Sequence, residues 1–104
     1  MIEIHPLQET AILIGLSLPG RDARRTEEQL DELAFLLETA GGVASKRFFQ
    51  RLEMPDPRTF VGRGKIIEIK NYIKEKNIDL VVFDDELSPA QFRNIERELE
   101  CRII

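Results

Sequence analysis

The sequence predicts an α/β domain with three layers, in which a four-stranded, mostly parallel sheet is flanked by helices in the order β-α-β-α-β-α-β. Two observations support this prediction. Apolar runs alternate along the chain with segments whose apolar residues recur every three or four positions, so strands and helices alternate. The first and third apolar runs are nearly continuous, which is typical of strands that are buried on both faces of a parallel sheet.

Length and composition predict a single domain. The chain has 104 residues, of which 42% are apolar and 33% are charged, and its formal net charge is -4. A chain of this size forms one hydrophobic core, so we expect one domain over residues 1–104. No apolar run approaches the roughly 20 residues that span a bilayer, and the amino terminus has no signal-peptide pattern, so we expect a cytoplasmic location. One cysteine and one histidine are too few for an internal disulfide or a Cys/His zinc cluster.

The first half of the chain contains two predicted strands around one helix. Residues 10–18 are almost continuously apolar and predict a buried strand. Thr26 and Gln29 have the spacing of a capping box, and Gly41 supplies the left-handed conformation in which helices often end. Residues 43–52 are rich in strand-forming residues and predict an edge strand. The predicted buried stripe of the helix consists of Leu30, Leu33, Ala34, Leu37 and Ala40, widened by Phe35 and Leu36.

The second half contains two further helices and two further strands. Isoleucines at helical spacing predict a helix that follows Gly64 and ends at Asn77. Residues 79–84 form a short apolar run, rich in β-branched residues and bounded by acids, which predicts a buried strand. Ser88 begins a capping box with proline at the first helical position, and a helix with the apolar stripe Phe92, Ile95 and Leu99 follows. Residues 101–104 predict the start of a fourth strand that is truncated.

Charge is divided unevenly along the chain. The segment from Lys46 to Lys76 holds nine basic and four acidic residues, a net charge of +5, whereas the flanking parts carry -5 and -4. Because the three strand-to-helix loops of a parallel sheet meet at its carboxyl edge, we expect their charges to be neighbours. The basic block is either a local anion-binding face or an ordinary solvated surface. The charged loop residues are Arg21, Arg24, Arg25, Arg58, Arg63, Lys65, Asp84, Asp85 and Glu86.

The run Gly62-Arg63-Gly64-Lys65, together with Arg58, is a candidate contact site for RNA or phosphate. Glycines let the backbone approach a phosphate, N–H groups at a helix start point outward, and the basic side chains add charge. The spacing matches neither the G-x-x-x-x-G-K-[ST] pattern of a P-loop nor the G-x-G-x-x-G pattern of a dinucleotide site. A glycine turn that only leads into a helix is the alternative interpretation.

Asp84 and Asp85 are candidates for a magnesium site or a general base, because a parallel sheet often places such carboxylates at this edge. The alternative is a favourable interaction with the positive end of the next helix. Ser88 is an N-cap by position and lacks a nearby base, so no catalytic residue is predicted.

The remaining reactive or aromatic side chains predict structural roles. Cys101 is expected to be a small buried residue rather than a reactive thiol, and His5 is expected at the surface. Aromatic residues near basic ones are able to stack nucleobases, but aromatic residues in strands are more often packing groups. The aromatic residues concerned are Phe48, Phe49 and Phe60.

Two long motifs carry a resemblance to a known family. Residues 50–51 and 55–65 form the first motif, and residues 82–96 form the second. They strongly resemble the amino-terminal domain of HflX-type GTPases, and residues 33–34 and 38–41 also look like the first helix of that family. The resemblance covers roughly residues 10–104. Residues 24–29 and 46–49 depart somewhat from the family pattern.

The resemblance implies a regulatory module that binds the large ribosomal subunit and its rRNA. In that family the domain precedes a helical segment and a GTPase domain, both absent from this chain, so GTP and magnesium belong to the GTPase domain. No GTPase chemistry or cofactor is then expected in residues 1–104. The alternative is an autonomous domain that binds ATP or another nucleotide, with Asp84 or Asp85 holding magnesium. The sequence supplies no phosphate loop for that alternative.

Overall fold

The computed structural model describes residues 8–20 and 22–104, so the predictions about His5 and Arg21 lie outside the described residues. Three helices and four strands alternate in the predicted order. The elements are β1 (Thr10–Ser17), α1 (Ala23–Thr39), β2 (Val43–Arg51), α2 (Arg63–Lys76), β3 (Leu80–Phe83), α3 (Pro89–Leu99) and β4 (Arg102–Ile103).

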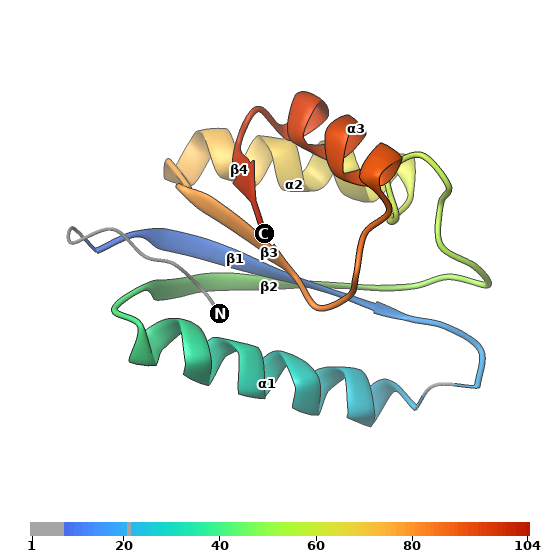
Figure 1. Ribbon diagram of the computed structural model, residues 1–104, viewed down its shortest axis with the longest axis horizontal. Helices are drawn as coiled ribbons and strands as arrows, with labels where there is room; N and C mark the ends of the chain where they lie inside the picture. The colour runs from blue at the N-terminus through green and yellow to red at the C-terminus, as the bar shows by residue number, and fades with distance from the viewer. Residues whose placement is uncertain (1–7, 21) are drawn as a thin grey trace.

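The four strands form one all-parallel sheet in the order β2-β1-β3-β4. Helix α1 lies on one face of the sheet, and α2 and α3 lie together on the other (Figure 1). Right-handed crossovers explain this division, because the chain moves in one direction from β1 to β2 and in the opposite direction from β2 to β3. The predicted three-layer α/β fold with a parallel sheet is confirmed.

Strand β1 supplies side chains to both cores of the domain. Ile12, Ile14 and Leu16 pack on the side of α2 and α3, whereas Ala11 and Leu13 pack on the side of α1. All five are at most 1% exposed. Burying a leucine or isoleucine side chain contributes roughly 1.5–3 kcal/mol, so this central strand is a main source of stability.

Helix α1 begins earlier than predicted, with Asp22 rather than Thr26 as its N-cap. The Asp22 carboxylate accepts the backbone N–H of Arg24 at 2.9 Å. Thr26 is fully buried inside the helix and packs over Gly15, where an added Cβ would lie 3.1 Å from Thr26 Cγ2. The predicted capping box at Thr26 and Gln29 is therefore wrong, because Thr26 is used to pack α1 closely on β1.

The buried stripe of α1 is also narrower than predicted. Phe35 and Leu36 were expected to widen it, but they are 67% and 50% exposed. Leu33 is half-buried and Ala40 is exposed. The helix packs on β1 and β2, so side chains outside this contact have no strand directly beneath them. The buried apolar residues of α1 are Leu30, Ala34 and Leu37.

The edge position of β2 and the capping box of α3 are confirmed. Gln91 N–H donates to Ser88 Oγ at 3.1 Å, and Ser88 N–H donates to Gln91 Oε1 at 2.9 Å. Phe92 was expected in the buried stripe of α3 but is 37% exposed. The buried stripe of this helix therefore consists of Ile95 and Leu99.

The chain reaches the carboxyl edge of the sheet at four strand ends. Ile104 N–H donates to Val81 O at 3.0 Å and Ile104 O accepts Phe83 N–H at 3.1 Å, which continues the pairing of β4 with β3. The loops after β1, β2 and β3 all leave the sheet at this edge; those after β1 and β2 lie on the right of Figure 1, and the loop after β3 lies nearer its centre. Within residues 8–20 and 22–104, no helix is both long and apolar enough to cross a membrane.

Candidate nucleic-acid interface

The loop from β2 to α2 is folded tightly around Asp56. Asp56 and Phe60 exchange two backbone hydrogen bonds, at 3.0 and 2.8 Å. The Asp56 carboxylate accepts the backbone N–H groups of Arg58 at 2.7 Å and Thr59 at 3.0 Å. Phe60 has a φ of 65°, in the left-handed region that non-glycine residues rarely adopt, and its ring is buried. The buried ring compensates for this backbone strain and fixes the loop on the core.

Helix α3 holds the other side of this loop. Gln91 Nε2 donates to Asp56 O at 2.9 Å, and Asn94 Nδ2 donates to Arg58 O at 3.1 Å. The side chain of Gln91 therefore caps α3 with its oxygen and anchors the loop with its nitrogen. These bonds physically couple the two long sequence motifs, residues 55–65 and 82–96.

Gly62 makes a close contact within the protein. Gly62 N–H donates to Gln50 Oε1 at 2.8 Å, and an added Cβ would lie only 3.1 Å from Gln50 Nε2. Gly62 is the N-cap of α2 and makes no side-chain capping bond. The next residues, Arg63 and Gly64, are exposed, and an added Cβ on Gly64 would meet open space. The start of α2 thus faces solvent between basic side chains.

Arg58 and Arg63 share one carboxylate, that of Glu98 in α3. Arg63 Nη1 lies 2.9 Å from Glu98 Oε2, and Arg58 Nη2 lies 3.8 Å from Glu98 Oε1. Both arginine side chains remain about two-thirds exposed, at 68% and 65%. Lys65 pairs separately with Glu68 at 3.0 Å. A surface pocket of about 260 Å³ is lined by Asp56, Arg58, Thr59, Arg63 and Glu98.

The hydrogen bond from Arg63 and the positive charges of Arg63, Arg58 and Lys70 hold the pKa of Glu98 below its ordinary value. A carboxyl whose pKa is lower in the folded state stabilises the fold above its unfolded-state pKa, and this contribution is lost as the pH falls through the folded-state value. We therefore expect wild type to melt above Glu98→Gln at about pH 7 and the difference to shrink as the pH falls through the lowered pKa of Glu98. Thermal melts across this range measure it, and a gap independent of pH would contradict the ion pair.

Asp84 and Asp85 follow β3 at the same edge of the sheet and are half-buried. Asp84 N–H donates to Ile14 O at 3.0 Å, so its backbone belongs to the end of the β1–β3 ladder. Among the described residues, no three His, Cys, Asp or Glu side chains gather closely enough to hold a metal ion. The magnesium role stays a prediction.

The structural roles expected for Cys101 and for two of the three phenylalanines agree with their burial. Cys101 is half-buried, its Sγ lies 3.6 Å from Ile78 O, and burial raises the pKa of its thiol, which disfavours the reactive thiolate. Phe48 and Phe60 are buried, whereas Phe49 is 42% exposed.

Sequence reasoning missed Glu98, Asn94 and the second role of Gln91. None of them has a local signature, because each acts on a loop more than thirty positions away along the chain. The second motif, residues 82–96, includes Gln91 and Asn94 and extends well beyond what a helix cap requires, but Glu98 lies outside it and had no such signal.

Comparisons with known proteins agree with this arrangement. A family profile described as GTP-binding GTPase N-terminal matches residues 27–104. The chain is 46% identical over 96 residues to a GTPase HflX of Flavobacterium psychrophilum, covering 92% of this chain and 23% of that protein. It is 43% identical over 104 residues to GTPase HflX of Escherichia coli, covering 100% of this chain and 24% of that protein.

Solved structures share the fold. A crystal structure of SsGBP in complex with GDP aligns with a TM-score of 0.67 at 24% identity, over 92% of this chain and 25% of that one. A GTP-binding protein of Sulfolobus solfataricus in complex with GDP aligns with a TM-score of 0.65, over 92% of this chain and 26% of that one.

The fold and the profile match define an α/β domain of the class found at the N-terminus of GTP-binding GTPases. Within that class, the chain belongs to the HflX family of GTPases. It spans about a quarter of the length of the curated relatives, which are named as GTPases.

Proposed function

We propose that this domain is the amino-terminal regulatory and ribosome-binding module of an HflX-type GTP-binding protein that acts on the large ribosomal subunit. In this proposal rRNA phosphates are contacted by the exposed start of α2 and the loop before it. Because phosphate contacts position a protein on nucleic acid without reading its sequence, binding is mainly electrostatic. The proposed contact residues are Arg58, Gly62, Arg63, Gly64 and Lys65.

The observation that carries the proposal is the arrangement of Arg58 and Arg63. Their guanidinium groups are largely exposed and are held beside each other by Glu98. The backbone beneath them is fixed by Asp56, Gln91 and Asn94. Two pre-positioned, solvent-facing cations match a pair of backbone phosphates, since arginine binds phosphate with a rigid fork of donors.

The distribution of charge between helices supports the same surface. Helix α2 carries five basic and two acidic residues, whereas α1, on the opposite face of the sheet, carries two basic and five acidic residues. Like charges repel, so RNA is favoured on the side of α2 and disfavoured on the side of α1.

We assign no catalytic residue to this chain. GTP hydrolysis, with its GTP and magnesium, belongs in our proposal to the GTPase domain that follows in the full-length protein. The second candidate function is binding of ATP or another nucleotide at the carboxyl edge, with Asp84 or Asp85 near a magnesium ion. Saturable nucleotide binding by the 104-residue chain that is lost in Asp84→Ala, or hydrolysis lost in the same variant, would favour this candidate.

The proposal is tested by Arg58→Ala, Arg63→Ala and Lys65→Ala, measured for binding to large ribosomal subunits across a salt series. Each lost phosphate contact lowers the slope of log affinity against log salt by about 0.9, with little change in sequence preference. Thermal stability is measured alongside, and we expect it to change little because exposed ion pairs contribute about 0–1 kcal/mol. Unaltered binding with a clear loss of stability would instead show that these residues serve only the fold.

A further inference from the structure

Strand β2 leaves one side of its backbone without a partner strand. It lies at the edge of the sheet, and among residues 8–20 and 22–104 no strand pairs with its outer side (Figure 1). Leu52 N–H donates to Ser17 O at 3.0 Å, and alternate residues of a strand turn their backbone groups to the same neighbour. The N–H and C=O groups of Arg47, Phe49 and Arg51 therefore point away from β1, along what we call the outer edge of β2.

The outer edge of β2 is regular over a length that can pair with another strand. The register between β1 and β2 shifts once, between Ala11 and Ile12, and then continues without a break from Lys46 to Arg51. Bulges and shortness commonly protect the edges of sheets from association. The shift here lies at the start of the strand, so the stretch from Lys46 to Arg51 keeps its pairing capacity.

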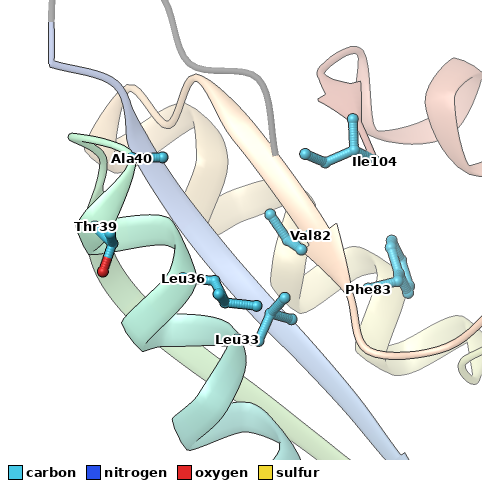
Figure 2. A pocket seen from close by; sticks show the side chains of 7 residues that line it. All are labelled: Leu33, Leu36, Thr39, Ala40, Val82, Phe83 and Ile104. Atoms are coloured by element: carbon cyan, nitrogen blue, oxygen red, sulfur yellow. The ribbon is translucent and has the colours of Figure 1, made fainter. Parts of the chain in front are cut away.

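A pocket of about 300 Å³ lies beside the outer edge of β2, between this strand and the first half of α1. Leu30 and Phe49 contribute apolar surface to it, and Phe49 is 42% exposed. The pocket is separate from the larger groove of about 560 Å³ that Figure 2 shows between α1 and β3. The outer edge of β2 thus has its own pocket for an apolar side chain. The lining residues are Ala23, Glu27, Leu30, Arg47 and Phe49.

The charges of β2 disfavour a second copy of this chain at the same edge. The strand carries Lys46, Arg47 and Arg51 and no acidic residue. Arg47 pairs with Asp31 of α1, whereas Arg51 is exposed and makes no ion pair within the part of the chain that the structure describes. Two copies paired through β2 would bring these basic residues together, and like charges on facing strands destabilise a sheet.

The same charges favour an acidic partner. The start of α1 adds to them, because its first turn holds the exposed Arg24 and Arg25 and no acidic residue. Ala23, the first residue of this helix, lines the pocket beside Phe49, and the positive end of a helix attracts a carboxylate. A chain that lies along the outer edge of β2 therefore meets positive charge at the end of the strand marked by Arg51.

We infer that the outer edge of β2 binds an extended acidic segment of a partner protein, which adds a fifth strand to the sheet. The segment pairs its backbone with Arg47, Phe49 and Arg51 and places an apolar side chain in the pocket beside Phe49. An acidic residue two positions away lies against Arg51, because residues i and i+2 of a strand share a face. Strand addition of this kind gains affinity from backbone hydrogen bonds and specificity from side-chain pockets.

The backbone of the outer edge distinguishes a polypeptide from RNA. It presents N–H donors and C=O acceptors in alternation, which another extended polypeptide complements, whereas phosphates supply acceptors alone. None of the proposed RNA contacts, Arg58, Gly62, Arg63, Gly64 and Lys65, lies in β2. The inference therefore does not rest on RNA binding.

A synthetic peptide on the unaltered protein provides the first test. The peptide has about eight residues, a usual strand length, and alternates threonine and valine around a central leucine, with an aspartate two positions away on each side. Fluorescence anisotropy of the fluorescein-labelled peptide with the full chain is expected to show saturable binding. Lysine in place of the aspartates is expected to weaken binding about tenfold, and methylation of the backbone nitrogens that face β2 by at least about as much.

Phe49 and Val43 provide a matched pair of variants. Both are exposed apolar residues of β2, at 42% and 38%, but only Phe49 lines the pocket. Phe49→Thr is expected to weaken binding of the aspartate peptide about tenfold, and Val43→Thr to leave it unchanged, while both keep a side chain that suits a strand. Arg51→Glu is expected to reverse the preference between the aspartate and lysine peptides, whereas Lys74→Glu, in the last turn of α2, is not.

Amide hydrogen exchange locates the bound peptide. Binding is expected to slow exchange at Arg47, Phe49 and Arg51 but not at Phe48 and Gln50, whose N–H groups already face β1.

Three results would overturn the inference. The first is equal binding of the aspartate, lysine and N-methylated peptides, or no binding of any of them. The second is a concentration-dependent dimer of the chain that Phe49→Thr dissociates, because a second copy would then occupy the edge. The third is a loss of ribosomal-subunit binding in Arg51→Glu without any binding of the aspartate peptide to the unaltered protein, which would assign the edge to RNA.

Discussion

Replacing Phe60 by alanine is expected to lower the free energy of unfolding by about 3–5 kcal/mol, the usual cost of removing a buried phenylalanine ring. Phe60 is 5% exposed, and its ring meets Phe83 edge-on at 6.0 Å between centroids. The left-handed φ of 65° at this residue is maintained by that burial, and alanine keeps the strain without the packing. Urea denaturation followed by circular dichroism measures the change.

Phe49→Ala is the matched control, since Phe49 is 42% exposed and carries the same side chain. Its expected loss is below about 1.5 kcal/mol, because little apolar surface is removed from the core. For a domain of 104 residues, each kcal/mol corresponds to about 4–8 °C in melting temperature, so the two variants separate clearly in a thermal melt. Equal losses of unfolding free energy in the two variants would show that the Phe60 ring does not anchor the loop to the core.

Removing both Arg58 and Arg63 is expected to weaken binding to the large ribosomal subunit about thirtyfold at ~0.15 M salt. Two phosphate contacts of slope ~0.9 each, lost at this salt concentration, give that factor. The double alanine substitution is made in a Glu98→Gln background and compared with Glu98→Gln alone, because otherwise the Glu98 carboxylate would lose both arginines with which it pairs. The slope of log affinity against log salt is expected to fall by just under two units.

Lys74→Ala with Lys76→Ala, made in the same Glu98→Gln background, is the matched control for charge. Both residues lie in the last turn of α2, at the far end from Arg63. Loss of two positive charges there is expected to change affinity by less than about threefold, because a charge farther than a Debye length of about 8 Å acts weakly. If both double variants weakened binding equally, net charge rather than the proposed surface would control association.

The order of elements could be read from the sequence because it depends on local periodicity. Each of these signals depends only on residues close in sequence, and the structure contains the corresponding element for each. They are the apolar runs at residues 10–18 and 79–84 and the capping box at Ser88. The start of α1 could not be read this way. Asp22 and Thr26 are both residue types that favour the N-cap position. Which of them begins the helix depends on the packing of Thr26 over Gly15, which the local sequence does not show.

The sequence predicted which basic residues form the candidate site but not how their side chains are paired. Arg58 and Arg63 stood out through the motif, but their shared partner Glu98 lies in the last turn of α3, a helix with several other charged residues. Its importance comes from the packing of α2 beside α3, which no local pattern contains. The exposure of Leu36 likewise follows from the number of helices that cover each face of the sheet, which no local pattern contains.

The central place of β1 in the sheet also has a consequence for folding on the ribosome. One edge of β1 pairs with β2, which follows it closely in the sequence, and the other edge pairs with β3, which is synthesised much later. The bond from Thr10 N–H to the Asp79 carboxylate, for example, spans 69 positions. Arg102 Nη2 donates to the Glu9 carboxylate across 93 positions. Contacts so distant in sequence form late and slowly. During synthesis the most apolar strand of the domain therefore keeps one edge open until most of the chain has emerged, which is when the nascent protein is most exposed to misassociation.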